Sequence, residues 1–255
     1  MKLGFIQPSR PRVNAHRGLS GVCPENTLPA FAAAVAVGAD EIEFDLWASR
    51  DGELVVCHDA ELDRTTNGHG RIGAWDWPDI RRLDSGRWFA AEWAGVAPCR
   101  LQDVLELCGG RTVLNIHIKE PGADGMVVRK TRDLLLECGL TGSAYLASEL
   151  DVLQCAVKHA PELARCCLES PSNGTRMLDC ALEYRCARVQ FWNPNLTPAD
   201  IERAHANGIA CNLFFGDRPD TPGEAERLVR MGIDTVLTNH ANCVIPGIRK
   251  LAAGR

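Results

Sequence analysis

Apolar residues recur along most of the chain in two alternating rhythms, one typical of amphipathic helices and one typical of short strands. The second half repeats one unit, because residues 197–209 and 221–233 both run from Thr-Pro to Gly-Ile. In each unit we expect the Thr to be the N-cap, with Pro at the first helical position and an acid completing a capping box. We expect the Gly to end the helix in the left-handed conformation, before an apolar strand. Residues 27–38 have the same length and predict a third helix of this kind.

Eight short apolar segments are predicted strands, and a helical segment separates each from the next. They are residues 13–15, 41–46, 113–118, 143–147, 163–168, 188–191, 209–215 and 234–238. This alternation implies parallel strands joined by right-handed crossovers, and eight units in about 250 residues fit the closed (β/α)8 TIM barrel. A doubly wound sheet, the alternative, needs fewer units or a second domain. No linker rich in Pro, Gly and Ser is visible, so residues 1–255 are predicted to form a single α/β barrel domain.

Residues 59–100 break the rhythm between the second and third predicted strands. They hold four of the six tryptophans and show little helical periodicity. Because structureless loops of this length are uncommon in compact domains, we predict a small folded insertion over the mouth of the barrel. We expect its tryptophans to form a small core of the insertion rather than to contact a ligand.

Composition and charge narrow the class of ligand. Lys+Arg 28 against Asp+Glu 33 gives a formal net charge of -5, and no basic run is present. A nucleic-acid or polybasic membrane surface would require such a run, so a small molecule is the expected partner. No segment approaches the roughly 20 apolar residues that span a bilayer, and residues 1–14 lack the apolar core of a signal peptide. We therefore expect a cytoplasmic protein without stable membrane insertion.

The twelve cysteines resemble a disulfide or zinc signal only in number. None forms a Cys-x-x-Cys pair, and most have apolar neighbours. A thiol in such surroundings behaves as a small buried hydrophobe in a reducing compartment. The adjacent Cys166 and Cys167 would alternate faces on a strand and could not hold one ion together.

In a barrel, chemistry gathers at the carboxyl ends of the strands. The first predicted strand ends in His16 and Arg17, and the second carries Glu43 and Asp45 on one face, which suits a divalent cation. The remaining candidates are His58, just beyond the second strand, and His117 and Lys119 on the third. A pair of histidines that exchange protons near neutral pH, a guanidinium, an ammonium and an acidic metal site together suit phosphoester chemistry.

The order of these motifs resembles the glycerophosphodiester phosphodiesterase family. The resemblance rests on His16-Arg17-Gly18, Pro24-Glu25-Asn26-Thr27, Glu43-x-Asp45, Asp51-Gly52, Val55-Val56-Cys57-His58-Asp59, Leu62-Asp63-Arg64-Thr65-Thr66-Asn67-Gly68 and Asn115-Ile116-x-Ile118-Lys119. It is specific over residues 16–68. From residue 120 onward, the chain matches the family in its alternation of strands and helices more than in particular residues.

The resemblance implies a metal-dependent barrel that hydrolyses glycerophosphodiesters to glycerol 3-phosphate and an alcohol. Carried over by position, the roles are an acid/base pair at His16 and His58, a phosphate clamp at Arg17, metal ligands at Glu43 and Asp45, and a phosphate or metal-shell cation at Lys119. The family's usual mechanism has one His deprotonate a glycerol hydroxyl that attacks phosphorus while the other protonates the leaving alcohol. Water then opens the cyclic phosphate.

Two positions depart from the family pattern. His117 stands where the family usually carries a third metal carboxylate, so we expect it to be a metal ligand that moves preference from calcium toward magnesium, manganese or zinc, with magnesium first. The alternative is that His117 leaves the metal and Glu149 or Glu169 supplies the oxygen. Asn239 stands where an acidic residue is common, which we expect to affect the accepted alcohol or sugar.

Aromatic residues at later strand ends are expected to line the pocket, and we assign Trp192 and Phe215 to substrate binding, with Phe214 beside them. Two other functions compete with the hydrolase. One is a lyase of the same architecture that stops at the cyclic phosphate, and the other is a phosphodiester-binding barrel that has lost turnover. The identity of the alcohol and the oligomeric state, including a homo-oligomer, stay open.

Overall fold

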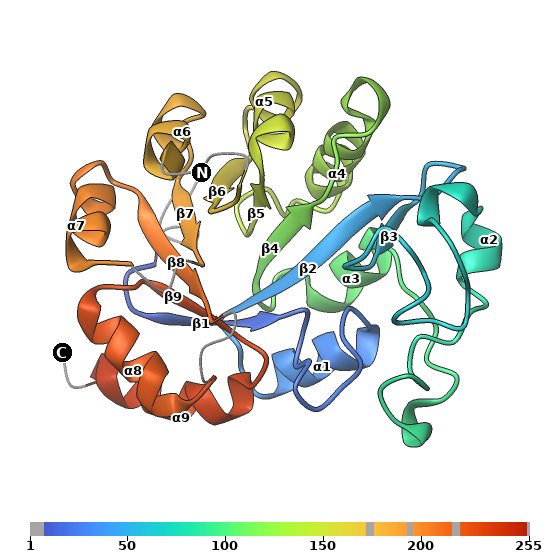
Figure 1. Ribbon diagram of the computed structural model, residues 1–255, viewed down its shortest axis with the longest axis horizontal. Coiled ribbons are helices and arrows are strands. Elements are labelled where there is room, and N and C mark those ends of the chain that lie inside the picture. The colour runs from blue at the N-terminus through green and yellow to red at the C-terminus, as the bar shows by residue number, and fades with distance from the viewer. Residues whose placement is uncertain (1–7, 172–175, 193–195, 216–219, 254–255) are drawn as a thin grey trace.

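Eight parallel strands close into a barrel in the computed structural model, which describes residues 8–171, 176–192, 196–215 and 220–253 (Figure 1). The strands are β1 (Arg12–His16), β2 (Glu41–Ala48), β4 (Val113–Ile118), β5 (Ala144–Ser148), β6 (Ala164–Leu168), β7 (Arg188–Phe191), β8 (Ala210–Phe214) and β9 (Thr235–Thr238). Strand β1 pairs in parallel with both β2 and β9, which closes the sheet on itself. The predicted TIM barrel is confirmed, and the predicted strands match these within a residue or two at each end.

Helices form a ring outside the barrel (Figure 1). They are α1 (Leu28–Ala36), α3 (Leu101–Cys108), α4 (Met126–Glu137), α5 (Leu150–His159), α6 (Met177–Glu183), α7 (Pro198–Ala206), α8 (Pro222–Met231) and α9 (Ala241–Ala253). Thr197 caps α7 in a full capping box with Asp200, as predicted. Thr221 also caps α8, but the carboxylate of Glu224 pairs with Arg227 instead of completing a box.

Side-chain alternation on the strands separates the large apolar core outside the sheet from an interior that holds polar side chains and a small apolar cluster. On β2, the outward residues Ile42 and Phe44 join the large core between sheet and helices. Cys166 and Cys167 lie in different apolar clusters, so they alternate faces as predicted, and all twelve cysteines are free.

The floor of the barrel interior is a buried ion pair. Arg188 and Glu41 are fully buried, with Arg188 Nη2 at 3.0 Å from Glu41 Oε1. The hydroxyl of Tyr145 donates to Glu41 at 2.8 Å, and the Asn212 amide donates to that hydroxyl at 3.1 Å. Hydrogen bonding on this scale is what allows charges to be buried at all. These contacts lie in a part of the interior where Arg188, Glu41, Tyr145 and Asn212 are all without solvent exposure.

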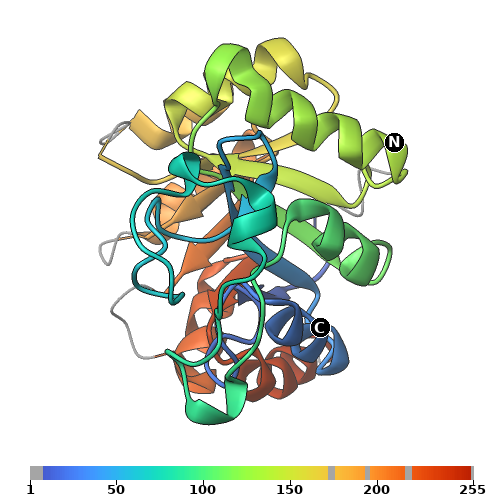
Figure 2. The same ribbon diagram turned by 90° about the vertical axis from the view of Figure 1, so that its right-hand side faces the viewer.

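The insertion starts earlier than the predicted residue 59. After β2 the chain turns at Gly52, whose φ is +81°, and β3 (Leu54–Val56) runs back antiparallel to β2. Three short helices follow, namely η2 (Ile72–Ala74), α2 (Trp77–Ile80) and η3 (Ala91–Trp93), and this region lies beside the end of β2 (Figures 1 and 2). Outside the insertion, one more short helical turn, η4 (Ala123–Gly125), precedes α4.

A separate apolar cluster holds the insertion together. It contains Val55, Cys57, Leu62, Ile72, Trp77 and Ile80, with Trp75 packed against it. Trp77 is therefore a core residue of the insertion, whereas Trp88 is 39% exposed. Across the described ranges of the chain, no helix combines the length and the apolar character required to cross a bilayer.

Candidate active site

A cavity of about 390 Å³ opens at the carboxyl ends of the strands. Its lining is His16, Arg17, Glu43, Asp45, His58, His117, Lys119, Glu149, Leu168, Glu169, Ser170, Pro171, Gln190, Trp192 and Phe214. All of the catalytic and metal-binding candidates of the sequence therefore meet in one place, although they lie on three strands and on the insertion.

The loop after β1 is held in an unusual backbone conformation. Arg17 has a φ of 55° and Asn26 has a φ of 57°, a region that non-glycine residues seldom adopt. The Arg17 backbone N–H donates to Glu43 Oε2 at 3.0 Å, and Asn26 Nδ2 donates to Asp45 Oδ2 at 2.8 Å. The loop after β1 thus holds the side chains of Glu43 and Asp45 in place through these two hydrogen bonds.

Glu43, Asp45 and His117 form a cluster that could hold a divalent cation. One ligand atom from each lies within 4.8 Å of the others. His117 Nδ1 is 3.1 Å from Asp45 Oδ1 and 4.0 Å from Glu43 Oε1. The cluster does not include Glu149 or Glu169, although both line the same cavity. The arrangement is consistent with the imidazole as the third ligand.

Two buried carboxylates, those of Glu43 and Asp45, determine the electrostatics of this cluster. Burial raises the pKa of Glu43, and the neighbouring charge of Asp45 raises it further. Burial also opposes ionisation of Asp45, but Lys119 and His117 hold the pKa of Asp45 well below its usual range. Lys119 Nζ lies 2.9 Å from Asp45 Oδ1. The mutual repulsion of the Glu43 and Asp45 carboxylates favours a bound cation, because it would allow both groups to ionise.

His16 is oriented by a residue from the opposite end of the chain. Its Nδ1 lies 2.7 Å from Asn239 Oδ1, which also accepts a hydrogen bond from the Ser20 hydroxyl at 3.0 Å. The amide oxygen only accepts, so Nδ1 carries the proton and Nε2 is left with its lone pair, 3.9 Å from Glu43 Oε2. Burial lowers the pKa of His16 to about 3, and the Arg17 charge adds to this effect.

His58 has a carboxylate in the equivalent position. Its Nδ1 lies 2.6 Å from Asp59 Oδ1. Hydrogen bonding from Arg64 lowers the pKa of Asp59 to about 2, so that carboxylate is ionised and the Nδ1 of His58 must be the donor. Burial lowers the pKa of His58 as well, although Asp45 opposes the change. Neutral His16 and His58 therefore carry the lone pair on the same nitrogen, Nε2.

Of the two aromatic candidates for substrate binding, Trp192 lies in the cavity wall and stays a candidate, whereas the expectation that Phe215 lines the pocket is wrong. Trp192 lines the cavity and is 55% exposed, whereas Phe215 is 2% exposed and belongs to the core outside the barrel. Strand alternation turns its neighbour Phe214 inward instead, where the ring lies 4.3 Å from that of His16.

Sequence reasoning did not assign the residues that orient the two histidines. Asn239 was expected to affect the choice of alcohol, but its side-chain oxygen accepts the hydrogen bond of His16 Nδ1. Glu25, Asp59 and Arg64 were noted only as parts of motifs, with no role. Only the His58–Asp59 pair could have been suspected from the sequence, because the two residues are adjacent. The contacts of Arg64 with Asp59 and Glu25 depend on the fold.

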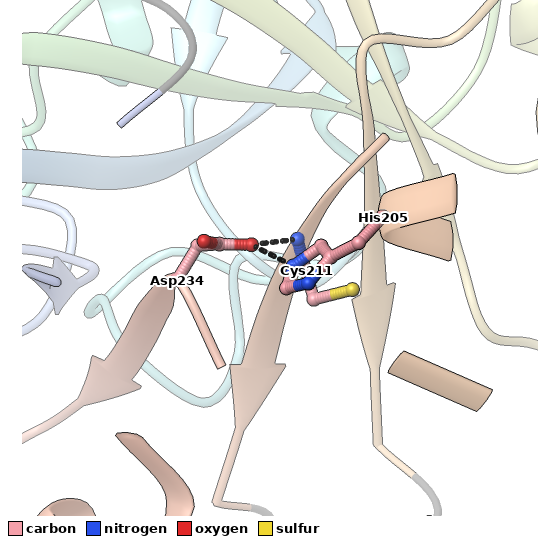
Figure 3. Close-up of side chains that lie close together, drawn as sticks. All are labelled: His205, Cys211 and Asp234. Carbon is pink, nitrogen blue, oxygen red and sulfur yellow. Dashed lines mark hydrogen bonds and ion pairs between the residues drawn. The ribbon is translucent and has the colours of Figure 1, made fainter. Parts of the chain in front are cut away.

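A second cluster of metal-ligand types lies at the other end of the barrel, where His205, Cys211 and Asp234 come together. Asp234 Oδ2 accepts from the Cys211 backbone N–H at 2.7 Å and lies 2.8 Å from His205 Nε2. Figure 3 shows the sulfur of Cys211 pointing away from the carboxylate. The contacts of Asp234 thus connect α7, β8 and the start of β9, and this role accounts for the cluster.

Comparison with known proteins agrees with this geometry. The profile of the Glycerophosphoryl diester phosphodiesterase family matches residues 16–242. A glycerophosphodiester phosphodiesterase of Caldanaerobacter subterraneus subsp. tengcongensis is 31% identical over 258 residues, which cover 93% of this chain and 98% of the relative.

Solved structures show the same fold over nearly the whole chain. A glycerophosphodiester phosphodiesterase from Agrobacterium tumefaciens has a TM-score of 0.78 at 26% identity, covering 92% of this chain and 99% of that one. An Oleispira antarctica phosphodiesterase, solved in complex with the product sn-glycerol-3-phosphate, has a TM-score of 0.84 at 25% identity, with 94% and 97% covered. The chain belongs to the glycerophosphoryl diester phosphodiesterase family.

Proposed function

We propose that this protein hydrolyses glycerophosphodiesters to glycerol 3-phosphate and an alcohol, using a divalent cation and the His16–His58 pair. One observation carries the proposal: a single cavity is lined by two imidazoles, a three-ligand cation cluster and two fixed cationic side chains. The relative from Oleispira antarctica, whose structure contains sn-glycerol-3-phosphate, supports the same product here.

Glu43, Asp45 and His117 are the proposed cation ligands. An imidazole in place of a third carboxylate makes the ligand set softer and less negative, which moves preference away from calcium, and among magnesium, manganese and zinc we propose magnesium first. The fit rests on the paired carboxylates, whose buried charges leave Glu43 with a raised pKa. When bound, such a cation neutralises charge on the phosphate and polarises a phosphoryl oxygen.

Arg17 and Lys119 are proposed to bind the phosphate. Both line the cavity, and both lie against Asp45, with Arg17 Nε at 3.6 Å and Lys119 Nζ at 2.9 Å from its oxygens. Their side chains are mostly buried, so their positions are fixed before substrate arrives. Charges that need no rearrangement stabilise a developing phosphorane charge effectively. Trp192 is proposed to contact the alcohol portion.

His16 and His58 are proposed to exchange the protons of the reaction. One takes the proton of the glycerol hydroxyl next to the phosphate, whose oxygen attacks phosphorus, and the other gives a proton to the departing alkoxide. The product is a cyclic phosphate, and water then adds to phosphorus and opens the ring. A substrate without that hydroxyl should not be cleaved by this route, and equal rates for both substrates would contradict it.

A phosphodiester lyase remains the second candidate, because the first half of this reaction already yields a cyclic phosphate. The binding barrel without turnover is the third, and the presence of both histidines, each with its lone pair on Nε2, argues against it. We also propose the cytoplasm as the compartment, since the twelve cysteines are all free and mostly buried.

The experiment is release of glycerol 3-phosphate from a panel of glycerophosphodiesters by metal-stripped protein, restored separately with magnesium, manganese, calcium and zinc. We expect metal-dependent turnover that is lost in His16→Ala. The His117→Glu variant should shift preference toward calcium, because a third carboxylate replaces the softer imidazole. Accumulation of cyclic phosphate would decide for the lyase, and the absence of turnover with every metal and substrate would contradict the proposal.

A further inference from the structure

Arg64 lies outside the cavity but is joined to it on two sides. Its guanidinium donates to Asp59 through Nε at 2.6 Å and to Glu25 through Nη2 at 2.7 Å. Nη1 makes a second contact with Glu25 at 3.1 Å. Each carboxylate in turn contacts a residue that lines the cavity, since Asp59 bonds to His58 and Glu25 accepts from Arg17 at 2.8 Å.

The five residues form one hydrogen-bonded chain, in the order His58, Asp59, Arg64, Glu25 and Arg17, in which the last four are alternately negative and positive. It connects the insertion, which carries His58 and Arg64, to the loop after β1. The Arg64 side chain is 42% exposed, and exposed ion pairs contribute little to stability. A planar guanidinium that forks between two carboxylates does fix geometry, because its donors have set directions.

The two ends of the chain do not depend on Arg64 equally. Arg17 keeps its contact with Glu25 and its ion pair with Asp45 if Arg64 is removed. Asp59 has hydrogen bonds only with His58 and Arg64 among its side-chain partners in the described residues. Without Arg64, the Asp59 carboxylate is free to turn, and the His58 ring loses the acceptor that fixes its Nδ1–H tautomer.

We propose that Arg64 is a positioning residue that anchors Asp59 to Glu25 and thereby fixes the ring orientation and tautomer of His58. The inference rests on the proposed catalytic role of His58. It gives the insertion a specific function, since the insertion supplies both His58 and the residue that holds its supporting carboxylate in place.

The test compares Arg64→Ala and Arg64→Lys with Arg50→Ala. Arg50 is a matched control, because it makes a two-point contact with Asp76 at the same insertion and does not line the cavity. We expect Arg64→Ala to lower kcat by about 10- to 100-fold with little change in KM, as misplacement of a catalytic group does. Arg64→Lys should recover only part of the rate, and added guanidinium should partly rescue Arg64→Ala.

A spectroscopic readout separates positioning from folding. The ¹⁵N resonances of the His58 ring should report the Nδ1–H tautomer in the wild type and in Arg50→Ala, and a mixture of tautomers in Arg64→Ala. The midpoint temperature of thermal unfolding should fall by similar small amounts in Arg64→Ala and Arg50→Ala.

The inference is overturned if Arg64→Ala matches Arg50→Ala in kcat, or if the His58 tautomer does not change. It is also overturned if the rate loss in both variants follows their loss of thermal stability. His58→Ala distinguishes the two proposals. If His58→Ala is inactive while Arg64→Ala is fully active, only the inference about Arg64 fails; if His58→Ala is fully active, the proposed role of His58 fails and the inference fails with it.

Discussion

The three histidines of the cavity differ in the group that faces Nδ1. For His16 it is a neutral amide from Asn239, for His58 it is the ionised Asp59, and for His117 it is Asp45 of the cation cluster. A neighbouring carboxylate stabilises an imidazolium, whereas an amide does so only weakly. The three histidines therefore differ in how strongly their surroundings favour the protonated ring.

Asn239→Asp should raise the pKa of His16. Burial and Arg17 keep that pKa low in the wild type, and a carboxylate 2.7 Å from Nδ1 would favour the protonated ring. The limb of the pH–rate profile that reports His16 should therefore move to higher pH, by about 1 unit or more, whether His16 acts as acid or as base. The measurement is kcat/KM against pH for the metal-loaded enzyme. An unchanged profile would show that Asn239 does not set the protonation of His16.

At the scale of elements, the insertion has an apolar cluster of its own and also contacts the barrel, for example through the Trp47 Nε1–H donated to the His58 carbonyl. Its apolar cluster is small, and polar contacts hold its outer turns. Asp84 accepts hydrogen bonds from the backbone N–H groups of Gly86, Arg87 and Gly95. These bonds lower the pKa of Asp84 to about 2, so the carboxylate is ionised at neutral pH.

Asp84→Ala should destabilise the outer turns of the insertion by about 2 kcal/mol, since three N–H groups lose a charged acceptor. In the wild type the folded pKa is depressed, so the stabilising contribution is present above the unfolded value and is lost as pH falls through about 2. Hydrogen exchange of the Gly86 and Gly95 amides measures the effect locally. Protection equal to that of the wild type would contradict it.

At the scale of the whole molecule, polar and apolar layers divide the barrel. The upper interior holds the cavity, the lower interior holds the Arg188–Glu41 pair, and the apolar core lies outside the strands. Tyr145 and Asn212 complete the hydrogen bonds of the floor. The pair connects β7 to β2 across the interior, so it contributes to barrel closure as well as to charge balance.

Arg188→Met should lower the free energy of unfolding by roughly 3 kcal/mol, because Glu41 loses its fully buried partner and keeps Arg12, whose Nη1 lies 3.1 Å from Glu41 Oε1. The double variant Arg188→Met/Glu41→Leu should recover much of that loss, as replacement of a whole buried pair by apolar side chains often does. Urea unfolding of both variants measures the difference. A single variant as stable as the wild type would show that other residues compensate the Glu41 charge.

Local sequence determined much of the fold. Periods of two and 3.6 residues and the Thr-Pro and Gly signals predicted the strands and several helix ends, because these signals act within a few residues. The seven candidates for catalysis, cation binding and phosphate binding also came from the sequence, since strand ends in a barrel converge on one face.

Tertiary structure decided the rest, which concerns partners and faces. The Asn239–His16 contact joins residues 223 apart, and the Arg64–Glu25 contact joins residues 39 apart, so no local period could reveal them. The choice between Phe214 and Phe215 depended on a one-residue register, which reverses the face of every side chain on a strand. Sequence thus determined which groups reach the cavity, and the packing of distant segments determined how each is oriented and which proton it holds.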